Sequence, residues 1–171
     1  MSSRTLVSVE EYLHTTYDPD CDYVDGELEE RNVGELDHSD LQGRVYSYFL
    51  NRSRALKIYP YVALRTQVSP TRFRIPDICV VAGPKPTEQV LTHPPLIAIE
   101  ILSKDDRMSA MQEKIADHLK FGVRYVWVID PVTRRAWEYS KDGARESKDG
   151  ILRTKNPASE LPLPEIFQAL E

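Results

Sequence analysis

Two carboxylates interrupt apolar stretches of this sequence. Glu100 is the only residue of LIAIEIL, residues 96–102, that is not aliphatic, and Asp77 lies between Pro76 and the apolar run ICVV. An ionised carboxylate in a buried strand is costly unless it pairs with a cation or binds a metal ion. Proline cannot donate a hydrogen bond within a sheet, so Pro76 belongs at a strand start, an edge or a bulge. We therefore expect Asp77 near a sheet margin.

Two carboxylates on adjacent strands would define a particular chemistry. Repulsion between Asp77 and Glu100 would raise a carboxyl pKa or recruit a cation between them. These two side chains and the backbone carbonyl of Ile101 would leave most of a coordination sphere to water, which suits Mg²⁺ or Mn²⁺. Such an ion polarises a phosphoryl oxygen and lowers the pKa of a bound water, as phosphodiester hydrolysis requires. A nearby lysine would orient the nucleophile or neutralise developing charge.

The spacing of apolar residues predicts the elements that position these groups. A capping box at Ser8 and Glu11 predicts a short first helix, and the strand that contains Glu100 must be covered on both faces. The expected elements are a helix over 9–14, a strand within 21–31, a long helix from His38 to before Pro60, a hairpin of strands 61–69 and 74–83, a strand at 96–103, a helix at about 105–121, and strands at 123–130 and 134–140.

The helix at about 105–121 carries an apolar stripe, and Gly122 follows it where a C-cap glycine belongs. The stripe is formed by Met108, Met111, Ile115 and Leu119. Lys114 lies at the flank of this stripe, where it either reaches the sheet margin or extends to solvent.

These elements predict an α/β fold with a mixed central sheet flanked by helices, in which the helix at 105–121 makes a crossover. The length fits a single domain over residues 1–171. The tail after Gly150 is expected to dock as a short helix.

Composition limits the possible partners and compartments. The net charge is -5, which disfavours a partner held by bulk electrostatics, so any phosphate contact must be local. Cys21 and Cys79 lack the spacing of a zinc site or a disulfide framework. We find no membrane span and no signal peptide, and expect a soluble cytoplasmic protein.

Several motifs occur in a fixed order: VEEYL at 9–13, DGEL at 25–28, PDICVV at 76–81, IEILS at 99–103 and GVRYVWVIDP at 122–131. Together they resemble the PD-(D/E)XK superfamily of restriction-endonuclease-like nucleases. Within it, the chain is similar to a bacterial restriction endonuclease group in which the catalytic lysine has moved to the following helix. The resemblance covers residues 9–139.

The resemblance implies roles for individual residues. Asp77, Glu100 and the Ile101 carbonyl would bind Mg²⁺ or Mn²⁺, and Lys114 would be the displaced lysine, because Leu102 occupies the usual lysine position. The chain departs from the group's pattern at Ala110, at His118, where a tyrosine is usual, and at the KDD turn after Ser103.

Simpler interpretations remain for each residue. Glu100 could be a strand-end glutamate paired with an arginine, Asp77 a turn residue, and Lys114 a surface lysine.

A second tier of candidates is weaker still. Glu27 is placed near the metal by the family pattern but resembles an exposed residue after a turn. His38 could contact phosphate, although we favour a place in the helix cap with Asp37 or Ser39 as the cap itself. Ser103 either bonds near Glu100 or starts the next helix.

The aromatic side chains of the last two strands alternate along each strand. They are Tyr125, Trp127, Trp137 and Tyr139. We interpret them as core and hairpin packing rather than as base-stacking platforms.

The sequence thus predicts a divalent-metal-dependent endonuclease that acts on DNA. We expect a homodimer, because cutting two strands often uses two symmetric sites. The alternative is a nuclease-derived module that binds nucleic acid or protein without cutting, which the acidic net charge and the displaced lysine would favour.

Overall fold

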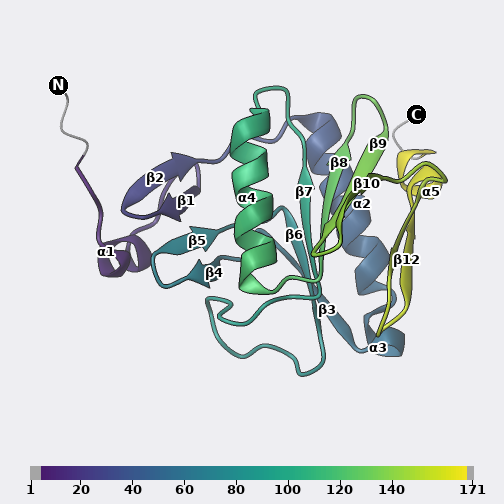
Figure 1. Ribbon diagram of the computed structural model, residues 1–171, viewed down its shortest axis with the longest axis horizontal. Helices are drawn as coiled ribbons and strands as arrows, with labels where there is room; N and C mark the ends of the chain where they lie inside the picture. Colours follow the sequence, from purple (N-terminus) through teal and green to yellow (C-terminus); the bar gives the residue numbers. More distant parts are fainter. Residues whose placement is uncertain (1–4, 169–171) are drawn as a thin grey trace.

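The computed structural model describes residues 5–168, which form a mixed α/β fold with three sheets (Figure 1). Six strands in the order β10-β9-β8-β7-β6-β3 make the central sheet, and the others have the orders β2-β1-β5-β4 and β11-β12. The helices are α1 (Val9–His14), α2 (Leu36–Leu50), α3 (Ser53–Leu56), α4 (Met108–Phe121) and α5 (Leu163–Gln168). The strands are β1 (Cys21–Val24), β2 (Glu27–Glu30), β3 (Ile58–Val62), β4 (Thr66–Ser69), β5 (Arg72–Arg74), β6 (Ile78–Ala82), β7 (Ile97–Ile101), β8 (Tyr125–Asp130), β9 (Arg135–Ser140), β10 (Gly143–Glu146), β11 (Ile151–Thr154) and β12 (Ser159–Pro162).

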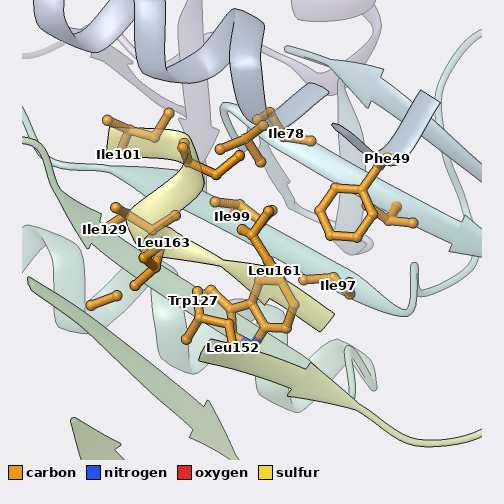
Figure 2. Packing of buried hydrophobic residues seen from close by; sticks show 14 of the residues in the cluster. Phe49, Ile78, Ile97, Ile99, Ile101, Trp127, Ile129, Leu152, Leu161 and Leu163 are labelled. Carbon is orange, nitrogen blue, oxygen red and sulfur yellow. The ribbon is translucent and has the colours of Figure 1, made fainter. Parts of the chain in front are cut away.

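Strand β7 is the most deeply enclosed part of the central sheet, and all of its residues are buried. It pairs with β6 on one side and β8 on the other. Ile97, Ile99 and Ile101 belong to the large core cluster that also includes residues of α2, β8, β12 and α5 (Figure 2). Ala98 instead packs with Met111 of α4. Because side chains alternate along a strand, Glu100 shares the face of Ala98 and points toward α4.

Helices α2 and α4 therefore cover opposite faces of the central sheet, and the predicted mixed sheet flanked by helices is confirmed. Strands β7 and β8 run parallel, and α4 forms the predicted crossover between them. Gly122 ends α4 in the left-handed conformation, as the sequence indicated.

The apolar stripe of α4 is confirmed except at its first residue. Met111 and Ile115 are buried and Leu119 is half-buried, but Met108 is 71% exposed. Met108 begins the helix and borders a surface pocket rather than the sheet.

The predicted hairpin of strands 61–69 and 74–83 is wrong. β3 pairs with β6 in the central sheet, whereas β4 pairs with β5 in the four-stranded sheet. Ala63 has a φ of 48°, in the left-handed region, and separates β3 from β4. Pro76 lies in the break between β5 and β6. Each predicted strand is thus divided between two sheets.

The long helix is shorter than predicted. It ends at Leu50, a separate turn of helix follows as α3, and Lys57 closes α3 with a φ of 52°. Pro60 lies inside β3 rather than after a helix. A proline is tolerated there because β3 is the outermost strand of its sheet, with an edge that needs no amide donor.

Two regions contain hairpins that periodicity did not resolve. The strand expected within 21–31 is a hairpin of β1 and β2, whose turn at Asp25 and Gly26 has positive φ at both positions. After β9, the chain forms β10, and β11 then pairs with β12. The short helix expected in the tail is confirmed as α5.

The cysteines behave as small core residues. Cys21 and Cys79 are both buried and free, and burial raises the pKa of Cys79 to about 12, so its thiol is unreactive at neutral pH. None of the helices within residues 5–168 has the length and apolar character of a membrane span.

Replacing Gly122 with alanine should destabilise the protein. Gly122 has a φ of +112°, and an added Cβ would lie 3.3 Å from Pro94 Cγ, so we expect a loss of more than about 1 kcal/mol in urea denaturation. Gly43 provides the matched control, because a Cβ there would meet nothing within 4 Å. Gly43→Ala should stabilise α2 by about 0.5–1 kcal/mol. Equal effects of the two variants would contradict this account.

Candidate active site

The pairing of β6 with β7 brings Asp77 and Glu100 together. Ile78 is opposite Ile99 in an antiparallel register, so continuing that register places Asp77 opposite Glu100 on the same face of the sheet. Both carboxylates are buried, at 5% and 3% exposure. Both line one pocket of about 20 Å³, which is enough for a single water or ion.

Three groups hold the Asp77 carboxylate in place. Its Oδ1 accepts a hydrogen bond of 2.8 Å from Arg31 Nη2, and its Oδ2 accepts one of 2.7 Å from the Ile101 amide. His38 Nε2 is 3.4 Å from Oδ2. The amide and carbonyl of one strand residue face the same side, so the Ile101 carbonyl also faces the β6 side, beside Asp77.

Glu100 is approached from α4 by two side chains. His118 is fully buried, and its Nε2 lies 3.1 Å from Glu100 Oε1. Lys114, one helical turn earlier, lines the same pocket as Glu100. Residues four apart lie on one face of a helix, so α4 presents both to the sheet.

Lys114 lies in a field of carboxylates. Burial lowers its pKa, but the charges of Glu100, Asp22, Asp106 and Asp77 together outweigh burial and raise the pKa above its usual value. Its Nζ is 3.9 Å from Asp22 Oδ2. Lys114 is therefore a protonated donor rather than a general base at neutral pH.

Asp106 and Ser103 shape the pocket entrance. Asp106 Oδ2 accepts hydrogen bonds from the amide of Ser103 at 2.7 Å and from its hydroxyl at 3.2 Å. Asp106 Oδ1 accepts a bond from Asn32 at 2.7 Å. Both Ser103 and Asp106 line the pocket.

A buried ionic network links α4 to the four-stranded sheet behind the pocket. Arg74 is fully buried, and its guanidinium lies 2.7 Å from Asp117 of α4. It also donates to Glu29 at 2.8 Å and to Asp22 at 3.3 Å. Burial raises the pKa of Asp22 more than Lys114 and Arg74 lower it. The network fixes α4 at the position that brings Lys114 to the pocket.

The structure brings together most of the residues predicted from the sequence. Asp77, Glu100, Ile101, Lys114, His38 and Ser103 all line the pocket. Glu27 does not, because it is exposed at the start of β2.

The predicted N-cap residue of α2 is wrong. Glu35 is the N-cap residue of α2 and makes no side-chain cap bond, so neither Asp37 nor Ser39 caps the helix. His38 lies within the first turn and reaches Asp77 instead. The hydrogen bond that the His38 ring donates to Asp77 is the largest effect on the pKa of His38 and raises it, against the opposing effect of burial.

Sequence reasoning missed Arg31, Asn32 and Asp106 in the pocket, and it gave His118 no role. A visible signal existed only for His118, which lies four residues after Lys114 on a helix predicted to pack against the sheet. Arg31 and Asn32 follow β2, and nothing in their spacing relates them to Asp77.

The donor atoms fit a hard divalent cation. Two carboxylates and a carbonyl are oxygen ligands, which suit Mg²⁺ or Mn²⁺ with the remaining positions left to water. Three acids, Asp77, Glu100 and Asp106, line the pocket with two fixed cations, Arg31 and Lys114. Within residues 5–168, no three His, Cys, Asp and Glu side chains are arranged to hold a metal, so a site here would depend on the Ile101 carbonyl and water.

Comparison with known proteins assigns the family. Residues 9–171 match the Uma2 family model, described as "Putative restriction endonuclease". The chain belongs to the Uma2 family. A solved structure from Anabaena variabilis, described as "a putative nuclease belonging to DUF820", matches with a TM-score of 0.85 and 21% identity over 96% of this chain and 99% of that chain. The family match and this likeness in fold together confirm the predicted restriction-endonuclease-like fold. A search of curated proteins finds no match.

Removing the buried arginine of this Uma2 protein should be strongly destabilising. Arg74→Met would leave Asp22 and Asp117 without their main cation, and we expect a loss of about 3–5 kcal/mol in urea denaturation. Arg135→Met is the control, because Arg135 pairs with Glu146 at the exposed surface and should change stability little. Similar losses of stability in both variants would contradict the view that the buried ion pairs of Arg74 contribute more than an exposed ion pair.

The contact between His38 and Asp77 should be measurable as a pKa. His38 should titrate above the usual value of about 6.5, because the Asp77 carboxylate stabilises the imidazolium. Asp77→Asn should lower that pKa, as followed by NMR titration of the ring protons. The ring signals of the exposed His93, which pairs with Glu88, provide a reference in the same spectra. A His38 pKa that does not respond would show that the contact is absent in solution.

Proposed function

We propose that this protein is a divalent-metal-dependent endonuclease that hydrolyses phosphodiester bonds in DNA. The observation that carries the proposal is the convergence of Asp77, Glu100, Ile101 and Lys114 on one small pocket at the end of β6 and β7. Membership of a family described as restriction endonucleases supports the reaction class. Fold alone would not, because one fold serves many functions.

Asp77, Glu100 and the Ile101 carbonyl would hold Mg²⁺ or Mn²⁺. When bound, such an ion would polarise the phosphoryl group and lower the pKa of a water ligand. The surplus of acids over fixed cations in the pocket supports this role, since a phosphodiester anion would otherwise be repelled.

Lys114 would stabilise charge as the phosphodiester is attacked. Its ammonium group lines the pocket beside Glu100, so it can donate to a phosphate oxygen or orient the attacking water. A preorganised cation in a water-poor site is effective for such stabilisation.

Arg31 and His38 would act on the other side of the pocket. Both side chains contact the Asp77 carboxylate and come from outside strands β6 and β7. These contacts hold the carboxylate beside Ile101. The five donors of a guanidinium suit phosphate oxygens, so Arg31 is also placed to contact the DNA backbone. His118 would orient Glu100 through the contact at 3.1 Å. Homodimerisation stays a prediction.

The proposal is tested by plasmid nicking with Mg²⁺ or Mn²⁺ against a chelator. Asp77→Asn, Glu100→Gln and Lys114→Met should each lower the cleavage rate by about 10²-fold or more. Asp142→Asn, an exposed acid in the turn before β10, should cleave like the unmodified protein. Cleavage that survives the Asp77 and Glu100 changes would exclude this site. Absence of cleavage by the unmodified protein would favour a binding module without catalysis.

A further inference from the structure

A second pocket opens beside the carboxylate pocket. It has a volume of about 310 Å³ and lies between the first turns of α4 and the neighbouring strands β8 and β9. Its lining includes Trp137, Tyr139, Met108 and Leu102. We call it the side pocket. Its size falls at the lower end of pockets that take small organic ligands.

The two pockets are adjacent and share part of their walls. Ser103, Asp106 and Met111 line both of them. A molecule bound at the carboxylates would therefore have its adjoining group next to the side pocket. If the carboxylate pocket hydrolyses phosphodiesters, as proposed above, that adjoining group is a nucleoside.

The lining of the side pocket suits a nucleobase. Trp137 and Tyr139 are half-buried on β9 and face α4, opposite Val128 and Val126 of β8. Aromatic side chains in contact with a base contribute affinity through stacking, whatever the base. Gln112 and Arg107 add hydrogen-bonding groups at the same pocket, as a base edge would require.

Core packing explains only some of the aromatic side chains on β8 and β9. Trp127 is fully buried in the large core cluster, as predicted. Trp137 and Tyr139 keep part of their surface at the side pocket, and Met108 adds an exposed apolar side chain at the same place. An apolar surface next to an acidic pocket is otherwise unexplained.

We propose that the side pocket binds the nucleobase of a nucleotide next to the scissile phosphodiester. A base inside a duplex is stacked and would have to be flipped out, at a cost of about a few kcal/mol, to enter such a pocket. The pocket therefore favours single-stranded DNA, or DNA with an unpaired nucleotide at the cut, over an intact duplex.

The test measures binding with Ca²⁺ in place of Mg²⁺, so that the pocket carboxylates are compensated, and a gel checks that the oligonucleotide stays uncut. Anisotropy of a labelled single-stranded oligothymidylate is compared with that of a labelled duplex of the same length. We expect tighter binding of the single strand, and Trp137→Ala should weaken it by roughly 5- to 150-fold, as expected for the loss of one stacked base. Tyr48→Ala is the control, because Tyr48 is a half-buried aromatic on α2, which covers the opposite face of the sheet.

A second variant tests the same pocket in case Trp137→Ala does not fold. Met108→Glu places a negative charge at the side pocket on a residue that is 71% exposed, so the fold should persist and binding of the single strand should fall. Tryptophan fluorescence gives an independent readout. Trp127 is fully buried, so quenching by the unlabelled single strand reports on Trp137.

The outcomes separate this inference from the proposed nuclease activity. Metal-dependent cleavage with equal binding of single strand and duplex, unaffected by Trp137→Ala and Met108→Glu, would overturn the side-pocket proposal alone. Single-strand binding that depends on Trp137, without cleavage under any metal, would overturn the nuclease alone. Failure of both binding and cleavage would overturn both.

Discussion

Three carboxylates, Asp22, Asp77 and Glu100, are buried at one end of this fold, and their charge must be compensated there. Isolated ionised carboxylates in a protein interior are strongly unfavourable. Each one is met by a cation or a donor from a different part of the chain: Asp22 by Arg74, Asp77 by Arg31, and Glu100 by His118. The need to pair these acids determines how the elements around the pocket are arranged.

Helix α4 shows this constraint most clearly. One part of its inner face is apolar and packs on β7 and β8 through Met111 and Ile115. The rest carries Lys114, Asp117 and His118, which enter the polar contacts between the two sheets. The helix is thus held by hydrophobic burial against the central sheet and by ionic contacts to the four-stranded sheet. Arg74 connects Asp117 to Asp22 and so makes the position of Lys114 depend on both.

The same arrangement places the ammonium group of Lys114 at the pocket. Leu102 follows β7 on the face where Glu100 points, and it packs with the α4 cluster. The ammonium group instead comes from α4, above the carboxylates. Lys114 reaches the carboxylate pocket from the helix, over the sheet, and the side pocket lies next to it, between α4 and strands β8 and β9.

The sequence by itself determined the secondary structure around the site, because periodicity, proline and glycine act locally. Three features were predicted: the strand that contains Glu100, the crossover helix that ends at Gly122, and the place of Asp77, after Pro76, near a sheet margin. The tertiary structure alone decided which strands pair. The local breaks at Ala63 and Pro76 gave no sign that β3 and β4 enter different sheets, and Arg31 and His38 reach Asp77 only through that packing. Charged residues that are far apart in the sequence pair because the whole fold buries them together. This burial depends on contacts between distant segments, so a short stretch of sequence cannot predict the pairing.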